Sequence, residues 1–218
     1  MEGFGLGILT PMTTDELATL TRKPDRAGDR RLLDEVLDEA RVGVLSTVTD
    51  DRLPWSVPML AARDGDRLLI HGSSGAGALR HVAAGAPVTF TAFLLDGLVV
   101  AETLFDHSVN YRSAVVRGRL QPVNADDGSR ALDIFSDAIL PGRSAEVRAH
   151  TRRELSATAI LALPIMDGCW LAKARAGGPG DDGAIGWTGH VPMKTVYGDP
   201  VTATPGEMPL SVRDIVGR

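Results

Sequence analysis

The feature that most constrains the fold of this sequence is a series of short runs rich in β-branched and aromatic residues, most of which follow one another without a helix between them. Up to eight such runs occur, at 42–49, 53–62, 67–72, 87–95, 98–105, 109–120, 157–165 and 169–176. A doubly wound parallel sheet needs a helix between most of its strands. The pattern therefore predicts a mainly β fold with inserted helices (α+β), of the β-barrel type.

Helical periodicity occurs at 30–41, 73–86, 125–140 and 144–155. The first segment is the clearest, because Leu33, Val36 and Leu37 belong to one apolar stripe and Asp29 stands where an N-cap residue is expected. Pro141 and Gly142 are expected to end the third helix.

An Asp-Gly pair, Asp96 and Gly97, lies between two β-rich runs. In that setting the pair is a strong short-range signal for a hairpin turn. We therefore expect 87–95 and 98–105 to be separate strands joined at this turn.

The chain of 218 residues is long enough for one domain with short additions. We expect an N-terminal arm over 1–29, a barrel domain over 30–193 and a C-terminal tail over 194–218, where apolar periodicity is low.

Composition disfavours several classes of protein. The net charge of −5 argues against a nucleic-acid partner, since duplex binding depends on a basic surface. No apolar run approaches the roughly 20 residues that span a bilayer, and the first residues lack the basic region of a secretion signal. We expect a cytoplasmic protein that binds neither nucleic acid nor membranes.

Cys169 is the single cysteine, so an intramolecular disulfide and a multi-thiolate metal site are both excluded. The five histidines, which are His71, His81, His107, His150 and His190, form no close ligand pair. We therefore expect no metal-ion site, although a lone axial histidine for haem stays open.

The segment 72–77, GSSGAG, follows a predicted strand and precedes a predicted helix. Backbone amides in such a loop favour an anion. The segment matches neither the dinucleotide-binding glycine pattern nor a phosphate-binding loop with Gly-Lys-Ser/Thr. On this ground alone we interpret it as a plain strand–helix turn.

The densest cluster of polar residues is 106–120, DHSVNYRSAVVRGRL. Alternation along a strand places Asn110 and Arg112 on one face and Tyr111 and Ser113 on the other. The pattern fits equally a strand whose start lines a site and an edge strand with a solvated face.

Several segments of this sequence resemble those of a known protein family. They are IHGSSGAGALRHV, DGLVVAETLFDHSVNYRSAVVRGRL, ILPGR, ELSATAILALPI, AKARAGGPGDD and WTGHVP, in this order. Together they resemble the pyridoxamine 5′-phosphate oxidase-like, FMN-binding split-barrel family, in its flavin-nucleotide-binding branch, which is related to the nitroimidazole-resistance reductases. The resemblance covers about residues 20–193, and the HSVNYRS and PGR blocks are its most specific parts.

The resemblance implies a split β-barrel of the FMN-binding type and a homodimer with two FMN sites at its interface, each built from both chains. The cofactor-binding residues that it implies are Met59, Leu60, His71, Gly72, Ser73, Ser74, Asn110, Tyr111, Arg112, Ser113 and Trp187. Trp187 would approach the flavin ring from the partner chain.

The chain departs from its relatives at three positions. Ala76 and Gly77 stand where a Ser-Arg pair is usual, and Ala and Gly offer neither hydroxyl nor guanidinium to a phosphate. Arg80, one helical turn further on, is expected to compensate together with Arg112. Glu102 replaces the usual Arg, and an acid there is unfavourable beside an anionic cofactor.

Three functions follow. The leading one is a flavin (FMN) oxidoreductase acting on a small molecule, with His71 or Glu102 as the catalytic proton donor or acceptor. The second is the same fold with haem or deazaflavin F420, used for a specialised biosynthetic redox step; His71, His81 or His107 would be the axial ligand of haem. The third is a non-catalytic module that binds a flavin or another small ligand.

Overall fold

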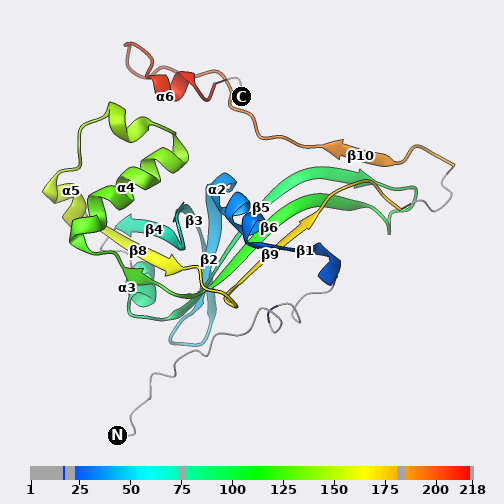
Figure 1. The fold of residues 1–218 in the computed structure, drawn as a ribbon, viewed down its shortest axis with the longest axis horizontal. Coiled ribbons are helices and arrows are strands. Elements are labelled where there is room, and N and C mark those ends of the chain that lie inside the picture. The colour runs from blue at the N-terminus through cyan, green and yellow to red at the C-terminus, as the bar shows by residue number, and fades with distance from the viewer. Residues whose placement is uncertain (1–16, 18–22, 74–76, 181–184, 217–218) are drawn as a thin grey trace, which may run out of the picture.

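A computed structural model describes residues 17, 23–73, 77–180 and 185–216. Within them one antiparallel sheet has the strand order β1-β9-β6-β5-β2-β3-β4-β8-β7, and β10 pairs with β5 off this path. The strands are β1 (Ala27–Gly28), β2 (Val42–Val48), β3 (Pro54–Asp64), β4 (Arg67–Ser73), β5 (Pro87–Val100), β6 (Ser108–Arg119), β7 (Gln121–Pro122), β8 (Thr158–Pro164), β9 (Trp170–Arg175) and β10 (Gly189–Pro192). The sheet curves without closing, so the predicted split barrel is confirmed (Figure 1).

The helical elements are short additions to this sheet. They are η1 (Pro24–Arg26), α2 (Arg30–Glu39), α3 (Gly77–Ala83), α4 (Ala125–Ile139), η2 (Arg143–Glu146), α5 (Arg152–Ala157) and α6 (Leu210–Arg213). Helix α2 begins as predicted, because the Asp29 carboxylate accepts a hydrogen bond from the Leu32 amide at 3.0 Å. Its buried side chains are Leu33, Val36 and Leu37, which confirms the predicted stripe.

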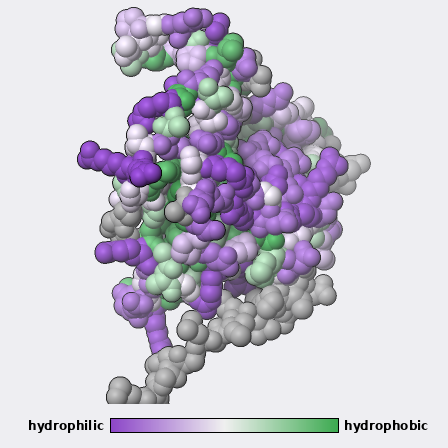
Figure 2. All heavy atoms as spheres, turned by 60° about the vertical axis from the view of Figure 1, so that its left-hand side comes forward, coloured by the Kyte–Doolittle hydropathy of each residue, from purple (hydrophilic) through white to green (hydrophobic). Residues whose placement is uncertain are grey.

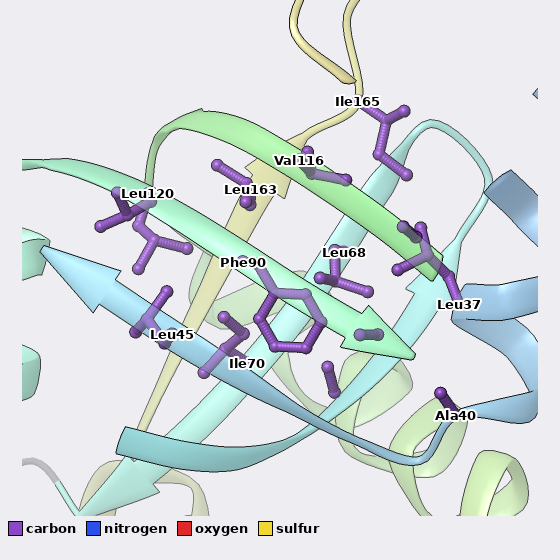
Figure 3. Close-up of a cluster of buried hydrophobic side chains, with 14 of the residues drawn as sticks. Leu37, Ala40, Leu45, Leu68, Ile70, Phe90, Val116, Leu120, Leu163 and Ile165 are labelled. Atoms are coloured by element: carbon purple, nitrogen blue, oxygen red, sulfur yellow. The ribbon is translucent and has the colours of Figure 1, made fainter. Parts of the chain in front are cut away.

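The main core lies inside the curved sheet and under α2 (Figure 3). Phe90 of β5 is completely buried at its centre, with Leu68 of β4, Val116 of β6 and Leu163 of β8 around it. Gly43 of β2 allows this packing, since a Cβ there would lie 2.2 Å from the Phe90 ring.

A second, smaller core fills the space between α4 and the other face of β4 and β8. It joins Ala131 and Phe135 of α4 to Leu69 and Ile160 of the strands. Strand β4 is therefore covered on both faces, and Leu68, Leu69 and Ile70 are all buried. On the side of the molecule where α4 and α5 lie, Figure 2 shows mostly hydrophilic residues with scattered hydrophobic ones.

The predicted hairpin turn at Asp96 and Gly97 is wrong. Strand β5 runs through both residues, and its register against β6 shifts between Leu95 and Gly97, so Asp96 is the extra residue of a β-bulge. The turn to β6 comes later, over 101–107. Gly97 is needed at the bulge for another reason, because a Cβ there would lie 2.8 Å from the carbonyl oxygen of Val191 in β10.

Strands β5 and β6 form a long hairpin that projects beyond the rest of the barrel (Figure 1). Strand β2 pairs only with the near part of β5, at 88–91, whereas β10 pairs with the far part, at 97–100. After β10 the chain runs back across the molecule to α6, where Glu146 of η2 accepts hydrogen bonds from the backbone and hydroxyl of Ser211. None of the described helices has the length and apolar character needed to cross a bilayer.

Candidate functional site

One face of the sheet formed by β2, β3, β5 and β6 points away from both cores, and it is called the outward face below. Its side chains are paired across the strands: Val42 lies opposite Leu60, Phe93 opposite Ser113, and Leu95 opposite Tyr111. Large apolar residues are exposed along it, namely Val42, Leu60, Phe93, Leu95, Leu98 and Val109. A monomer seldom leaves so large an apolar surface in water without a use for it.

Tyr111 and Ser113 bring hydroxyl groups to this apolar face. They stand in adjacent outward positions of β6, and both are half-buried. On β9 their neighbours are Arg175 and Lys173, respectively. The outward face thus combines exposed apolar side chains with hydrogen-bonding groups, as an aromatic ring system with polar edges requires.

The other two polar residues of the cluster point to the opposite side, as the alternation predicts. Asn110 is buried, its amide nitrogen donates to the Gly177 carbonyl at 3.0 Å, and its amide oxygen accepts from Arg175 at 2.6 Å. These two bonds fix the end of β9. Asn110 therefore has a structural task in this protomer.

Arg112 is surrounded by carboxylates. Its guanidinium donates to Asp96 at 2.8 Å, to Glu39 at 2.6 Å and to Glu35 at 2.7 Å, which joins the β5 bulge to α2. The hydrogen bonds to Asp96, followed by those to Glu39, raise the pKa of Arg112 well above its usual value. A phosphate at Arg112 would have to displace these three carboxylates.

His71, the first predicted residue at the end of β4, lies at the second core. His71 is half-buried under α4, and its ring meets the Phe135 ring edge-on at a centroid distance of 4.4 Å. Burial lowers the pKa of His71, so its imidazole is neutral at pH 7. No described residue forms a hydrogen bond with this ring.

The residues that follow His71 lead to α3. Gly72 lets α3 approach β4 closely, because a Cβ there would lie 2.3 Å from the Leu79 side chain. Ser73 is exposed at the end of the strand, and the predicted Ser74 lies outside the described residues. Arg80 is exposed on α3, and its guanidinium forms no hydrogen bond or ion pair with a described residue.

The two other candidate haem ligands have backbone partners. A ring nitrogen of His81 lies 3.1 Å from the Val48 carbonyl oxygen, and one of His107 lies 3.0 Å from the Ala101 carbonyl oxygen. Among these three histidines, only His71 is half-buried and has ring nitrogens that accept or donate no hydrogen bond with a described residue.

The remaining predicted residues are widely separated. Met59 points inward and packs against the main core, whereas its neighbour Leu60 is exposed on the outward face. Glu102 lies in the turn between β5 and β6, where its carboxylate accepts from the Ile185 amide at 3.1 Å. Trp187 is exposed just ahead of β10. His71 and Glu102, the two alternative candidates for proton transfer, thus lie on different elements, at the α4 side and at the end of the hairpin.

One protomer therefore places Leu60, Tyr111 and Ser113 on the same face of the sheet, but not the whole predicted set. The apolar part of the outward face, above all Phe93, Leu95 and Leu98, was missed by sequence reasoning. A signal was present, since the run FLL at 93–95 makes β5 apolar on both faces, a pattern typical of a strand that is covered on both sides.

The residues of the outward face fit a flavin, and His71 fits a haem. A flavin needs an apolar surface for its ring system and hydrogen bonds at its polar edges, and the outward face offers both. A haem iron needs a neutral imidazole with a free nitrogen, and His71 meets that requirement among the described residues.

Comparison with known families gives a match over most of the sheet. The family model described as Pyridoxamine 5′-phosphate oxidase matches residues 29–168. A comparison with the curated proteins gives no match.

Three solved structures are similar to this chain. The FAD and haem binding protein from Mycobacterium smegmatis is 40% identical, with a TM-score of 0.85, over 88% of this chain and 98% of that chain. The flavocytochrome Anf3 from Azotobacter vinelandii is 25% identical, with a TM-score of 0.82, over 95% of this chain and 100% of that chain. A candidate 5-nitroimidazole antibiotic resistance protein from Bacteroides thetaiotaomicron, 18% identical with a TM-score of 0.58 over 67% and 84% of the two chains, shares the fold.

Proposed function

Because this chain belongs to the pyridoxamine 5′-phosphate oxidase family, we propose that it is a flavin-binding redox protein that acts on a small molecule as a homodimer. The flavin would lie on the outward face, between the two protomers. The observation that carries the proposal is the meeting of exposed apolar side chains with Tyr111 and Ser113 on that face. Covering this surface with a ring system and a second copy would remove it from water.

We propose FAD as the form of the flavin, in place of the FMN that the sequence favoured. The terminal phosphate of FMN is close to a dianion at pH 7, and it needs a concentrated positive charge. Arg112 is already engaged with Asp96, Glu35 and Glu39, so Arg80 is the remaining cation of the predicted pair. The dinucleotide spreads its charge over two phosphates, and the name of the 40% identical protein from Mycobacterium smegmatis includes FAD.

The flavin, when bound, supplies the electron transfer. The protein would bind and orient it: Leu60 and Phe93 exclude water from the ring, and the hydroxyls of Tyr111 and Ser113 hydrogen-bond its polar edge. Glu102 and His71 keep their predicted roles as proton donor or acceptor only if substrate reaches them. A His71→Ala variant that retains full turnover would remove His71 from that role.

The first experiment is an absorption spectrum of the purified protein, followed by heat release and mass analysis of the bound molecule. A two-band flavin spectrum with released FAD is the expected result. Released FMN would show that Arg80 and backbone amides suffice for the monophosphate. A protein that stays colourless and does not bind added FAD or FMN would refute the proposal.

Matched variants locate the flavin. Tyr111→Phe combined with Ser113→Ala should weaken flavin binding about thirtyfold, since each of the two lost hydrogen bonds contributes about 1 kcal/mol. Ser156→Ala removes a hydroxyl from α5, where it binds the Arg152 carbonyl, and should leave the affinity unchanged. Equal affinities for all three proteins would move the flavin away from the outward face.

A second candidate function is haem binding through His71. Its specific observation is the half-buried imidazole with no described hydrogen-bond partner, and two of the similar structures are a haem-binding protein and a flavocytochrome. Haemin titration should produce a Soret band that His71→Ala abolishes and that His81→Ala and His107→Ala retain. A Soret band that survives His71→Ala would exclude this ligand.

A further inference from the structure

After β10 the chain continues as an extended segment that leads to α6. Residues 193–209 contain neither a helix nor a strand, and of residues 193–208 all except the half-buried Tyr197 are exposed. This segment and α6 together are called the C-terminal strap below. The strap crosses the molecule from the hairpin to the side where α4 and α5 lie (Figure 1). A segment with so little buried surface keeps its path only through a few fixed contacts.

The first contact of the strap is between Tyr197 and Arg41. The Arg41 guanidinium donates a hydrogen bond to the Tyr197 hydroxyl, and its central carbon lies 5.5 Å from the centroid of the tyrosine ring. The same guanidinium donates to the Ala138 carbonyl oxygen at 3.1 Å, at the C-terminal end of α4. Since the Arg41 carbonyl accepts from the Ala61 amide of β3 at 3.2 Å, Arg41 is fixed to the sheet and joins the strap to α4.

The second contact of the strap is between Ser211 and Glu146. Ser211 is buried, its backbone amide donates to the Glu146 carboxylate at 3.0 Å, and its hydroxyl donates to the other carboxylate oxygen. These bonds, that of the hydroxyl first, lower the pKa of Glu146. Glu146 belongs to η2, and Ser144 of the same element donates its amide and its hydroxyl to Asp137 of α4 at 2.8 and 2.6 Å. The strap is thus joined to α4 a second time.

The PGR block at 141–143 forms the turn between α4 and η2. Gly142 has a φ of 83°, which glycine adopts without strain, and it turns the chain directly after α4. Arg143 then pairs with Glu146 at 3.3 Å. The block therefore presents the Glu146 carboxylate to the strap.

Helix α4, to which the strap is joined, covers His71. Phe135 is one turn before Ala138 on the same face of the helix, and its ring meets the His71 ring edge-on. Among the described residues the second core under α4 is small, since three of its six buried residues are alanine. Ion pairs hold the first half of α4, for example Arg130 with Asp64 at 2.7 Å. The end of α4, which carries Phe135, depends instead on the two joints to the strap.

We propose that the C-terminal strap latches the end of α4 over His71 and thereby controls the access of ligands to the imidazole. A docked strap keeps Phe135 against the His71 ring, and release of the strap lets the last turns of α4 move away and uncover it. This inference deepens the second candidate function, haem binding through His71, and rests on it for the identity of the ligand.

The test compares two double variants of the full chain. The strap variant is Tyr197→Ala with Ser211→Ala, which removes the ring and the two hydroxyls that hold the strap. The control is Val196→Ala with Val201→Ala, which shortens two side chains of the same segment that are 69% and 96% exposed.

Native-state hydrogen exchange measures the local opening of α4 without any cofactor. Amides of residues 135–139 should exchange about tenfold faster in the strap variant than in the wild type. Those of α2 should keep their rates, and the control should exchange as the wild type does. Should protection fall equally in α2, Ser211→Ala alone is measured, and an equal fall there too would overturn the proposal. Unchanged exchange of α4 in the strap variant would also overturn it.

Chemical modification measures the access to His71 directly. Diethyl pyrocarbonate acylates accessible imidazoles, and mass analysis should show His71 modified about tenfold faster in the strap variant, relative to the exposed His190 of β10. Faster exchange of α4 without faster modification of His71 would refute the latch.

Haemin separates a failure of the latch from a failure of the haem function. The Soret band that depends on His71 should form faster in the strap variant than in the control, and equal rates would count against the latch. If no Soret band forms while exchange and modification respond as expected, the haem function is refuted and the latch stands.

Discussion

Strand β3 passes through two regions of the sheet whose surroundings differ. At its far end, Ala61 and Ala62 are consecutive and both buried, because the main core lies on one side and α4 on the other. At its near part, Met59 packs inward and Leu60 is 40% exposed on the outward face. Among the described residues, α4 covers the first region, whereas the outward face of β2, β3, β5 and β6 stays exposed. Apolar side chains stabilise the protomer in the first region and are available for binding in the second.

The largest difference between the two regions is expected when two aromatic residues three positions apart on β5 are truncated. Phe90→Ala removes the completely buried ring at the centre of the main core and should lower the free energy of unfolding by about 3–5 kcal/mol. Phe93→Ala, on the outward face, should change the unfolding of the monomer by less than about 0.5 kcal/mol. Urea unfolding at low protein concentration measures both, and equal losses would show that the outward face is part of the protomer core.

A glycine pair tests the tightness of the covered region. In Gly43→Ala the new Cβ would lie 2.2 Å from the Phe90 ring and 2.8 Å from the Thr91 carbonyl oxygen. The resulting overpacking should cost about 1–3 kcal/mol of unfolding free energy. Gly178→Ala, which meets no atom within 4 Å, is the control. Identical urea midpoints for the two variants would contradict the packing described for β2 on β5.

The ion-pair cluster around Arg112 joins the β5 bulge to helix α2. Arg112→Gln should lower the free energy of unfolding by about 1–2 kcal/mol, since it leaves Asp96, Glu35 and Glu39 without their shared cation. The loss should shrink in high salt, which screens the repulsion among these carboxylates. Arg148→Gln removes an exposed pair with Glu154 and should have little effect in the same titration. A loss that is unchanged in high salt would point to packing as its cause.

The smallest expected effect is a pH dependence at His71. Burial lowers its pKa, so the unfolded chain takes up a proton below about pH 6.5 before the folded chain does. The contribution of His71 to stability is therefore present above pH 6.5 and is lost as the pH falls through the lowered pKa. His71→Gln should make urea midpoints at pH 7.5 and pH 5.5 more similar than in the wild type. An unchanged difference would exclude His71 as its source.

Local patterns predicted the parts of the fold that local chemistry decides. The cap at Asp29 and the stripe of α2 depend on neighbours within one or two turns, and the alternation of Asn110 and Tyr111 follows from the strand itself. The bulge at Asp96 could not be predicted in this way. An Asp-Gly pair suits a hairpin turn and a bulge equally, and the contacts that decide between them come from Arg112 and from β10, far along the chain.

The candidate site was predicted only in part, because some of its features depend on contacts between residues far apart in the sequence. The face on which Tyr111 and Ser113 lie follows from alternation, whereas the engagement of Arg112 depends on Glu39, which is 73 residues away. The sequence at β6 carries no information about that neighbour. The resemblance to a family supplied the cofactor class, and the contacts of this chain decide which of its residues are still available to hold one.

The division of the β5 edge between two strands has a consequence for protein synthesis. Strand β2 pairs with 88–91 and is synthesised long before β10, which pairs with 97–100. Until residues 189–192 emerge, the far half of β5 presents unpaired backbone groups next to exposed Phe93, Leu95 and Leu98. Such an edge is a template for the strand of another nascent chain. Strand β10 thus completes the pairing of the β5 edge late in synthesis and ends the period in which that edge is exposed.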